Sequence, residues 1–204
     1  NDSFTSAGTT TFDSDTDNDG SGTFTLASAL SAGNNAISLT AGGLALNSTL
    51  SSGTASTTIL ASLSGATIGL GASSCGGTCG VSLTSTELGN ITAGSLTIGN
   101  TSNGAITVEG VSSTDSDQFG SLTLNATASG SSVTFENSDS TFQGLTVNAE
   151  NGITLSSNLT TNGTTSFDSD SDSDGTGDFT LAASKTLSTT NNALSLTSND
   201  IAFG

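Results

Sequence analysis

The sequence predicts an all-β protein and, within that class, a β-solenoid with about 20–26 residues per coil. Three observations lead to this prediction: short strand phrases recur along the chain, the phrases return at coil-length spacing, and proline is absent. Without proline, every residue keeps the backbone N–H that a β-ladder needs. We therefore expect residues 1–204 to form one continuous solenoid.

The strand phrases consist of an apolar residue, a small or hydroxyl residue, and a second apolar residue. This period of two places apolar side chains on one face of a strand and small polar ones on the other. Clusters of Gly, Asn, Ser and Asp between the phrases supply turns. No apolar pattern of helical period continues for three turns, so we expect essentially no helix. The predicted strands cover residues 24–26, 37–39, 44–46, 68–70, 81–83, 96–98, 106–108, 122–124, 133–135, 145–147, 153–155, 179–181 and 194–196.

The spacing of related phrases indicates coils. G-S-L-T-I at Gly94, G-S-L-T-L at Gly120 and G-L-T-V at Gly144 begin 26 and 24 residues apart, and a second strand and a weaker apolar point follow each. Two or three short strands per repeat of this length are typical of a β-solenoid, here with eight or nine coils. A pair of β-sandwiches is the alternative, because it also has short strands with frequent turns. The absence of Trp and Tyr and the self-similar phrases favour the solenoid.

A longer internal repeat of about 156 residues begins again before the chain stops, so that residues 10–46 match residues 165–203. Phe12 matches Phe167 at an offset of 155, whereas N-N-A-I-S-L-T returns as N-N-A-L-S-L-T at an offset of 157. The second copy has therefore gained two residues, around Lys185. The long unit should contain six or seven coils.

Several runs resemble the repeat regions of very large bacterial surface proteins of the filamentous haemagglutinin-like type. These runs include N-N-A-I-S-L-T-A-G-G-L-A-L-N-S-T-L-S-S-G, G-S-L-T-I-G-N-T-S-N-G-A-I-T-V and G-I-T-L-S-S-N-L-T-T, and the resemblance covers nearly the whole chain. It implies a secreted, right-handed parallel β-helix that serves as an adhesin or a surface fibre.

The charge balance excludes several classes of partner. The net charge is −17, and Lys185 is the sole basic residue. A field of this sign repels nucleic acid and anionic membrane surfaces. No run approaches eighteen apolar residues, so we expect no membrane span. The first residues, N-D-S-F-T-S-A-G, have neither the basic flank nor the apolar core of a signal peptide, and we interpret the chain as a mature piece or an excised fragment.

Two acidic stretches give the most specific local signal. Each has Asp at every second position followed by Gly, as in D-S-D-T-D-N-D-G and D-S-D-S-D-S-D-G. Closely spaced carboxylates raise one another's proton affinity unless a cation lies among them, and alternate oxygen ligands ending at a glycine resemble the calcium loops of dockerins and thrombospondin-type repeats. The twelfth position of each loop is Leu instead of an acid, so ligands from a neighbouring coil or water must complete a site. A solvated acidic loop without metal is the alternative. The predicted calcium ligands are Asp13, Asp15, Asp17, Asp19, Asp168, Asp170, Asp172, Asp174 and Asp178.

Cys75 and Cys79 lie four residues apart in C-G-G-T-C. A metal site would need further Cys or His ligands, and the chain has none. We therefore predict a local disulfide and, from it, an oxidising compartment; a pair of free thiols is the alternative.

The chain contains few side chains that could support catalysis. The chain has no His, and Lys185 lies in an apparent insertion, so acid–base chemistry would depend on carboxylates alone. A glycosidase needs two of them, and the candidates outside the acidic loops are Glu109, Asp115, Asp117, Glu136 and Asp139. Because there is no Trp or Tyr to support a sugar ring, we expect no enzymatic activity.

The sequence thus favours a structural role: a calcium-stiffened segment of an extracellular or cell-surface fibre that associates with itself, by head-to-tail stacking or by continuation into further repeats. An adhesin that engages glycans, other cells or ice through a Thr/Ser/Asn face is the alternative, and a glycosidase is the third hypothesis.

Overall fold

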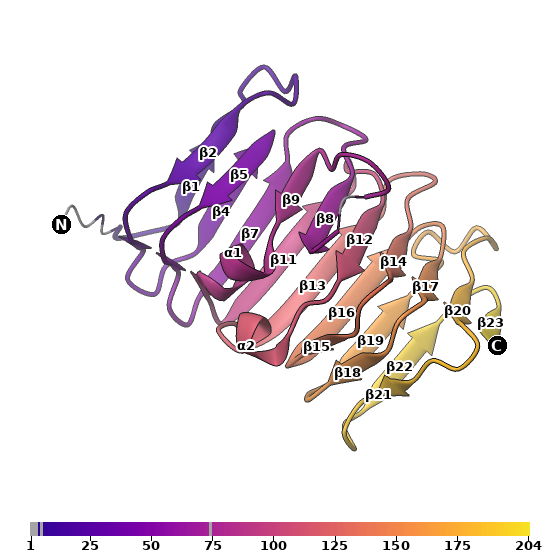
Figure 1. Ribbon diagram of the computed structural model, residues 1–204. Coiled ribbons are helices and arrows are strands. Elements are labelled where there is room, and N and C mark those ends of the chain that lie inside the picture. The colour runs from indigo at the N-terminus through magenta and orange to yellow at the C-terminus, as the bar shows by residue number, and fades with distance from the viewer. Residues whose placement is uncertain (1–3, 5, 74) are drawn as a thin grey trace.

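The structure, a computed structural model, describes residues 4, 6–73 and 75–204. Its strands stack in parallel along one axis into a β-solenoid of about eight turns, with the first and last coils at opposite ends (Figure 1). This confirms the predicted fold class. Each of the thirteen predicted strand phrases lies within a strand.

The main sheet receives one strand from every coil, and we number the coils 1–8 by these strands. Pairing is parallel and in register, so that Leu96 lies opposite Leu122 and Leu122 opposite Leu145. The strands are β1 Thr10–Asp13, β4 Ile37–Ala41, β7 Ser56–Ala61, β11 Ser95–Asn100, β13 Ser121–Ala126, β16 Gly144–Ala149, β19 Thr165–Asp168 and β22 Leu194–Thr197.

A second and a third side complete each coil. The second side contains a seven-stranded sheet of β9 Val81–Leu83, β8 Ile68–Gly71, β12 Ile106–Glu109, β14 Val133–Phe135, β17 Ile153–Leu155, β20 Phe179–Leu181 and β23 Ile201–Phe203, and the pair β2 Thr23–Leu26 and β5 Gly43–Leu46. The third side contains two short sheets, of β3 Leu30–Ser31, β6 Leu50–Ser51 and β10 Ile91–Thr92, and of β15 Ser140–Phe142, β18 Leu159–Thr161 and β21 Leu187–Ser188.

Two short helices, α1 Ser85–Gly89 and α2 Ser113–Ser116, pack against each other on the third side. The sequence pattern predicts essentially no helix, so these two short helices depart from the prediction. Their signal was present, because in each case a Ser or Thr precedes an acidic residue by three positions, as in a capping box. The Glu87 carboxylate accepts a hydrogen bond of 2.9 Å from the Thr84 backbone N–H, and Asp115 accepts one of 3.2 Å from that of Ser112.

Coil 3 departs from the predicted coil length. Thr57 in β7 pairs with Leu96 in β11, 39 residues later. The extra length holds a loop that includes residues 72–73 and 75–80, the additional strand β9 and helix α1. Strand β9 pairs with β8 and contacts β5, so it fills the second side between coils 2 and 3.

Inward-facing side chains of all coils form one apolar core. Leu122 and Leu124 are fully buried, whereas Thr123 between them faces outward and is half-buried. This alternation follows from the period of two in the sequence. Burial of the inward-facing apolar side chains favours the stacking of one coil on the next. No helix within the described ranges has the length and apolar character that a membrane crossing needs.

The internal repeat corresponds to six coils. β1 and β4 are equivalent to β19 and β22, since Phe12 pairs with Leu39 as Phe167 pairs with Leu196. The two additional residues of the second copy lie in the link from β20 to β21, where Lys185 is exposed. Coils 1 and 2 therefore recur in the same register as coils 7 and 8.

Candidate functional site

Two acidic loops lie at the same corner of the solenoid, where the chain passes from the main sheet to the second side. The first acidic loop, residues 14–22, joins β1 to β2, and the second acidic loop, residues 169–178, joins β19 to β20. The other coils turn this corner in six or fewer residues; in coil 2, Gly42 alone separates β4 from β5. The two loops are therefore conspicuous extensions six coils apart on one edge.

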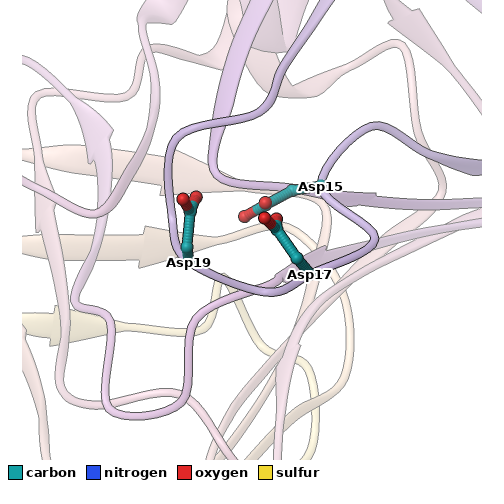
Figure 2. Close-up of side chains that lie close together, drawn as sticks. All are labelled: Asp15, Asp17 and Asp19. Atoms are coloured by element: carbon teal, nitrogen blue, oxygen red, sulfur yellow. The ribbon is translucent and has the colours of Figure 1, made fainter.

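The first acidic loop brings three carboxylates together. Ligand atoms of Asp15, Asp17 and Asp19 all lie within 4.8 Å of one another, and Figure 2 shows the three side chains projecting into the space that the loop encloses. Asp17 and Asp19 are exposed, whereas Asp15 is only 3% exposed. The Asp15 carboxylate accepts hydrogen bonds from the Gly20 backbone N–H, at 2.8 Å, and from the Ser62 hydroxyl.

The bond to Ser62 fixes the direction of this loop. Ser62 belongs to coil 3, so the loop crosses over coil 2 to reach it. Gly42 makes the crossing possible, because a methyl group at Gly42 would approach the carbonyl carbon of Gly20 to 2.4 Å. The loop packs further against Leu63, whose Cδ2 atom would lie 3.0 Å from a methyl group at Gly20.

The electrostatics of the first loop are those of an unneutralised acidic cluster. The hydrogen bond from Ser62 lowers the pKa of Asp15, and the Gly20 N–H acts in the same direction against the effect of desolvation. The pKa of Asp17 is raised by its side-chain hydrogen bond with Asp15 and then by the charge of Asp19. A carboxyl group surrounded in this way holds a proton more tightly until a cation replaces it.

The second acidic loop forms its cluster with a different coil. Ligand atoms of Glu150, Asp172 and Asp174 lie within 4.8 Å of one another, and Glu150 follows β16 in coil 6. Glu150 is 8% exposed and accepts a hydrogen bond of 2.6 Å from the Gly130 backbone N–H. Desolvation, followed by the charge of Asp174, raises the pKa of Asp172. The side-chain hydrogen bond from Thr176 lowers that of Asp174.

Glu150 is the residue that sequence reasoning did not identify. The acidic motif indicates that a neighbouring coil or water must complete the site, but the motif itself does not show that coil 6 pairs with coil 7. Once Asn148 is aligned with Asp168, as the two are in the sheet, Glu150 falls at the same corner as the second loop. That alignment was the available signal.

Four of the predicted ligands lie outside both clusters. Two of these shape local turns: the Asp13 carboxylate accepts a hydrogen bond of 3.1 Å from the Asp15 backbone N–H, and Asp170 accepts one of 3.1 Å from that of Asp174. A third, Asp178, joins neighbouring coils, because it accepts a hydrogen bond of 3.2 Å from the Asp200 backbone N–H. The fourth, Asp168, has a buried Oδ1 atom without a hydrogen-bond partner among the described residues.

Both clusters suit a hard cation chemically. Each offers carboxylate oxygens alone, which are ligands that Ca²⁺ and Mg²⁺ prefer, and Ca²⁺ takes six to eight oxygens. Three carboxylates supply part of such a shell, and backbone carbonyls and water would supply the remainder. The clusters are open enough for water, because two of the three acids in each are exposed.

Cys75 and Cys79 are joined by a disulfide with Cα atoms 5.2 Å apart. The bond lies over the outer side of β8, where a methyl group at Gly69 would come within 2.3 Å of the Cys79 sulfur. Gly69 occupies the position at which Thr107 stands in the next coil. The absence of a side chain at this position thus gives the disulfide its place on the sheet.

Three of the five carboxylates considered for glycosidase chemistry accept hydrogen bonds from neighbouring side chains or backbone. Asp115 accepts a hydrogen bond of 2.6 Å from the Ser112 hydroxyl, and Asp139 accepts two of 3.0 Å from Asn158. Asp117 accepts one of 2.8 Å from the Gln118 side chain. The other two lie on neighbouring coils of the second side, Glu109 at the end of β12 and Glu136 directly after β14.

An unbroken row of hydroxyl groups follows the outer face of the main sheet. One Ser or Thr from each of the eight coils occupies the same register position: Thr11, Ser38, Thr58, Thr97, Thr123, Thr146, Ser166 and Ser195. The row stays regular although the coils differ in length. The neighbouring row is mixed and includes Leu60, Gly99 and Asn125, so the face does not carry the Thr-x-Thr double row that the adhesin hypothesis would favour.

No protein-family model matches the chain, and no significant match was found among curated proteins or solved structures. Of the expected resemblance to haemagglutinin-like repeat regions, the structure supports the coarser part, a parallel β-solenoid of about eight turns.

Proposed function

We propose that this chain is a structural segment of an extracellular or cell-surface fibre. It has no catalytic role, and calcium ions in its acidic loops stiffen the stack of coils. In this role the chain contributes its coils to the length of the fibre, together with further coils of the same kind.

The main support for this proposal is the exposure of apolar side chains on coil 8. Coil 8 repeats coil 2, in which Ile37 and Leu46 are each 1% exposed because coil 3 covers them. Their equivalents Leu194 and Phe203 are 44% and 67% exposed. The same inner surface is thus covered by a next coil in one copy of the repeat and open in the other, so the edge suits the addition of another coil.

Calcium is supported by the two carboxylate clusters at one corner of the stack. The second cluster joins the loop of coil 7 to Glu150 of coil 6, so an ion held there would tie two coils together. The first acidic loop already reaches from coil 1 to Ser62 of coil 3, and an ion among its three carboxylates would remove their repulsion. Either ion would make local opening of the stack less favourable.

An extracellular location is supported by the disulfide, since such bonds persist in oxidising compartments. The low content of charged residues, 9%, and the abundance of hydroxyl and amide side chains suit a surface that is hydrated without basic groups. Secretion follows from the proposed role in a surface fibre.

A binding module is the second candidate, and the row of hydroxyl groups, one from each of the eight coils, favours it. Regularly spaced hydroxyls on a flat sheet can donate and accept hydrogen bonds to a glycan chain that runs along the fibre. This role is compatible with the structural one, because a fibre can also adhere.

Electron microscopy of the native material tests the structural proposal. Fibres that soften or fragment in a calcium chelator are expected. Compact particles of uniform size in the presence of calcium would contradict the proposal.

A further inference from the structure

The chain contains three Asn-Gly pairs, and the structure places them in three different environments. The pairs are Asn103-Gly104, Asn151-Gly152 and Asn162-Gly163. Asparagine is chemically labile, and before a glycine it can lose its side-chain amide without an enzyme, because the glycine has no β-carbon to hinder attack by its backbone nitrogen. The reaction has two conditions: the asparagine side chain must be free to turn, and the glycine N–H must not be held by an acceptor.

Asn103-Gly104 meets neither condition. Asn103 is 1% exposed, and its side-chain amide donates a hydrogen bond of 2.8 Å to the Gly104 carbonyl oxygen. Its side-chain oxygen accepts a hydrogen bond from the Asn100 backbone N–H. The Gly104 N–H donates a bond of 2.9 Å to the Ala66 carbonyl oxygen. Both reacting groups of this pair are therefore held in place.

Asn151-Gly152 meets one of the two conditions. The Asn151 side chain is exposed, but Gly152 is buried, and its N–H donates a hydrogen bond of 3.0 Å to the Ser169 carbonyl oxygen of the next coil. Attack by this nitrogen would break the bond and leave a buried carbonyl oxygen unpaired, which costs free energy. The pair is therefore protected at the attacking atom.

Asn162-Gly163 meets both conditions. The pair lies between β18 and β19, at the corner where the chain passes from the third side to the main sheet. Asn162 is exposed, and neither its side chain nor the Gly163 N–H has a hydrogen-bond partner among the described residues. The Asn162 backbone N–H keeps the corner in place through a bond of 2.9 Å to the Phe142 carbonyl oxygen. The reacting groups are thus free on a backbone that remains folded.

A groove of about 410 Å³ adjoins this corner. It gives the Asn162 side chain room to turn and admits the water that the reaction consumes. Its lining includes residues 162–164 and, from the two preceding corners on this edge of the solenoid, Gly120, Ser121, Gln143 and Gly144.

We propose that Asn162 is the site at which the folded chain deamidates. The Gly163 nitrogen gives up its proton and forms a bond to Cγ of Asn162. The bond from Cγ to the amide nitrogen breaks, and this nitrogen leaves with the proton as ammonia, so that a five-membered succinimide remains. Water then opens the ring at one of its two carbonyl carbons. One opening gives aspartate, and the other gives isoaspartate, in which the main chain runs through the former side chain.

Both products change the solenoid at this corner. Each puts a carboxylate in place of a neutral amide and adds one negative charge to the net charge of −17. Isoaspartate also adds one carbon atom to the main chain between β18 and β19, which pair in register with β15 and β16. The added atom displaces one strand relative to the other, so this coil should open locally more readily. The inference does not depend on the proposed fibre function.

Peptide mapping of the full chain, aged in mildly alkaline buffer, tests the proposal. Mass spectrometry should show the amide of Asn162 replaced by a hydroxyl group, in separable aspartate and isoaspartate forms, whereas Asn103 and Asn151 keep their amides. The same incubation in urea is the control, because all three pairs should react once the chain is unfolded. Asn162→Gln should remove the more acidic species from isoelectric focusing of the aged folded protein, and the matched variant Asn151→Gln should leave it.

Two results would overturn the proposal. One is loss of ammonia at Asn151 as fast as at Asn162 in the folded chain, since the hydrogen bond of Gly152 would then give no protection. The other is an intact Asn162 in the folded chain under conditions in which the unfolded chain reacts. Circular dichroism after the incubation establishes that the folded sample has stayed folded.

Discussion

The side-chain amide of Asn148 donates a hydrogen bond of 2.8 Å to the side-chain oxygen of Asn125, one coil away on the outer face of the main sheet. The next register position along this row is Asp168. A carboxylate has no N–H to donate, so Asp168 cannot extend this amide contact by a further coil, and its Oδ1 atom is buried without a partner in the described part of the chain.

Asp168→Asn should therefore stabilise the protein. The new amide can donate to Asn148 and extend the row, and one added hydrogen bond contributes about 1 kcal/mol to the free energy of unfolding. Urea denaturation measures this change. Asp13→Asn is the control, because Asp13 is the exposed equivalent in coil 1 and its replacement removes the same charge without extending a row. Equal effects of the two substitutions would show that charge alone is responsible.

Calcium should raise the melting temperature. An ion that binds the folded chain and not the unfolded one stabilises by mass action, by about 2.7 kcal/mol at a hundredfold excess over its dissociation constant. The double substitution Asp17→Asn and Asp172→Asn should remove the shift, because it takes one ligand from each cluster. Glu150→Gln should remove only the part due to the second cluster, and Asp117→Asn, an exposed acid outside both loops, should leave the shift intact. Identical melting curves in calcium and in chelator would contradict the calcium proposal.

The stability of the calcium-free protein should depend on the protonation of Asp17. The pKa of Asp17 is raised in the folded state by Asp15 and Asp19. Its contribution to stability is therefore complete below the pKa of the unfolded chain and is lost as the pH rises through the folded pKa. Asp17→Asn removes this loss, so the free energy of unfolding of the variant should rise relative to the parent between acidic and neutral pH. Denaturation in chelator at several pH values measures the difference in the free energy of unfolding between variant and parent. A difference that stays constant with pH would contradict the raised pKa of Asp17.

The disulfide should be present in the native protein. Mass spectrometry without reducing agent should find Cys75 and Cys79 in one linked peptide, lighter than the dithiol by the mass of two hydrogens. Replacing both cysteines by serine should lower the free energy of unfolding by about 2 kcal/mol, the value that loop entropy gives for so short a loop. Thiols that react at once with an alkylating agent in the untreated protein would remove the main support for an oxidising compartment.

Much of the fold was predictable because a solenoid repeats one local rule. Apolar residues alternate with Thr or Ser in each strand, and this local pattern alone places Leu122 inside and Thr123 outside. The exceptions arise where a non-local contact decides the structure. β9 was found as a strand, but its place between β5 and β8 depends on the disulfide loop that returns the chain to the same side. β7 is not among the predicted strands because its inner positions begin with Thr57, which hydrogen-bonds to Ser52 within the core at 2.9 Å.

The candidate sites were only half predictable for the same reason. The alternation of aspartates identified Asp15, Asp17 and Asp19, which one loop brings together by itself. The second cluster replaces Asp170 with Glu150, a residue of another coil, and the acidic motif contains no information about that partner. The first loop also depends on residues outside itself, because it crosses Gly42 of coil 2 to reach Ser62 of coil 3.

Cryo-electron microscopy of the native material, imaged in calcium at a resolution that separates strands, tests the central claim most directly. Coils stacked along one axis should give an elongated particle with an axial spacing of about 4.8 Å between strands, and density should cover Leu194, Ile201 and Phe203. An isolated particle of eight coils, with these side chains facing solvent, would contradict the claim that the chain is a segment of a fibre.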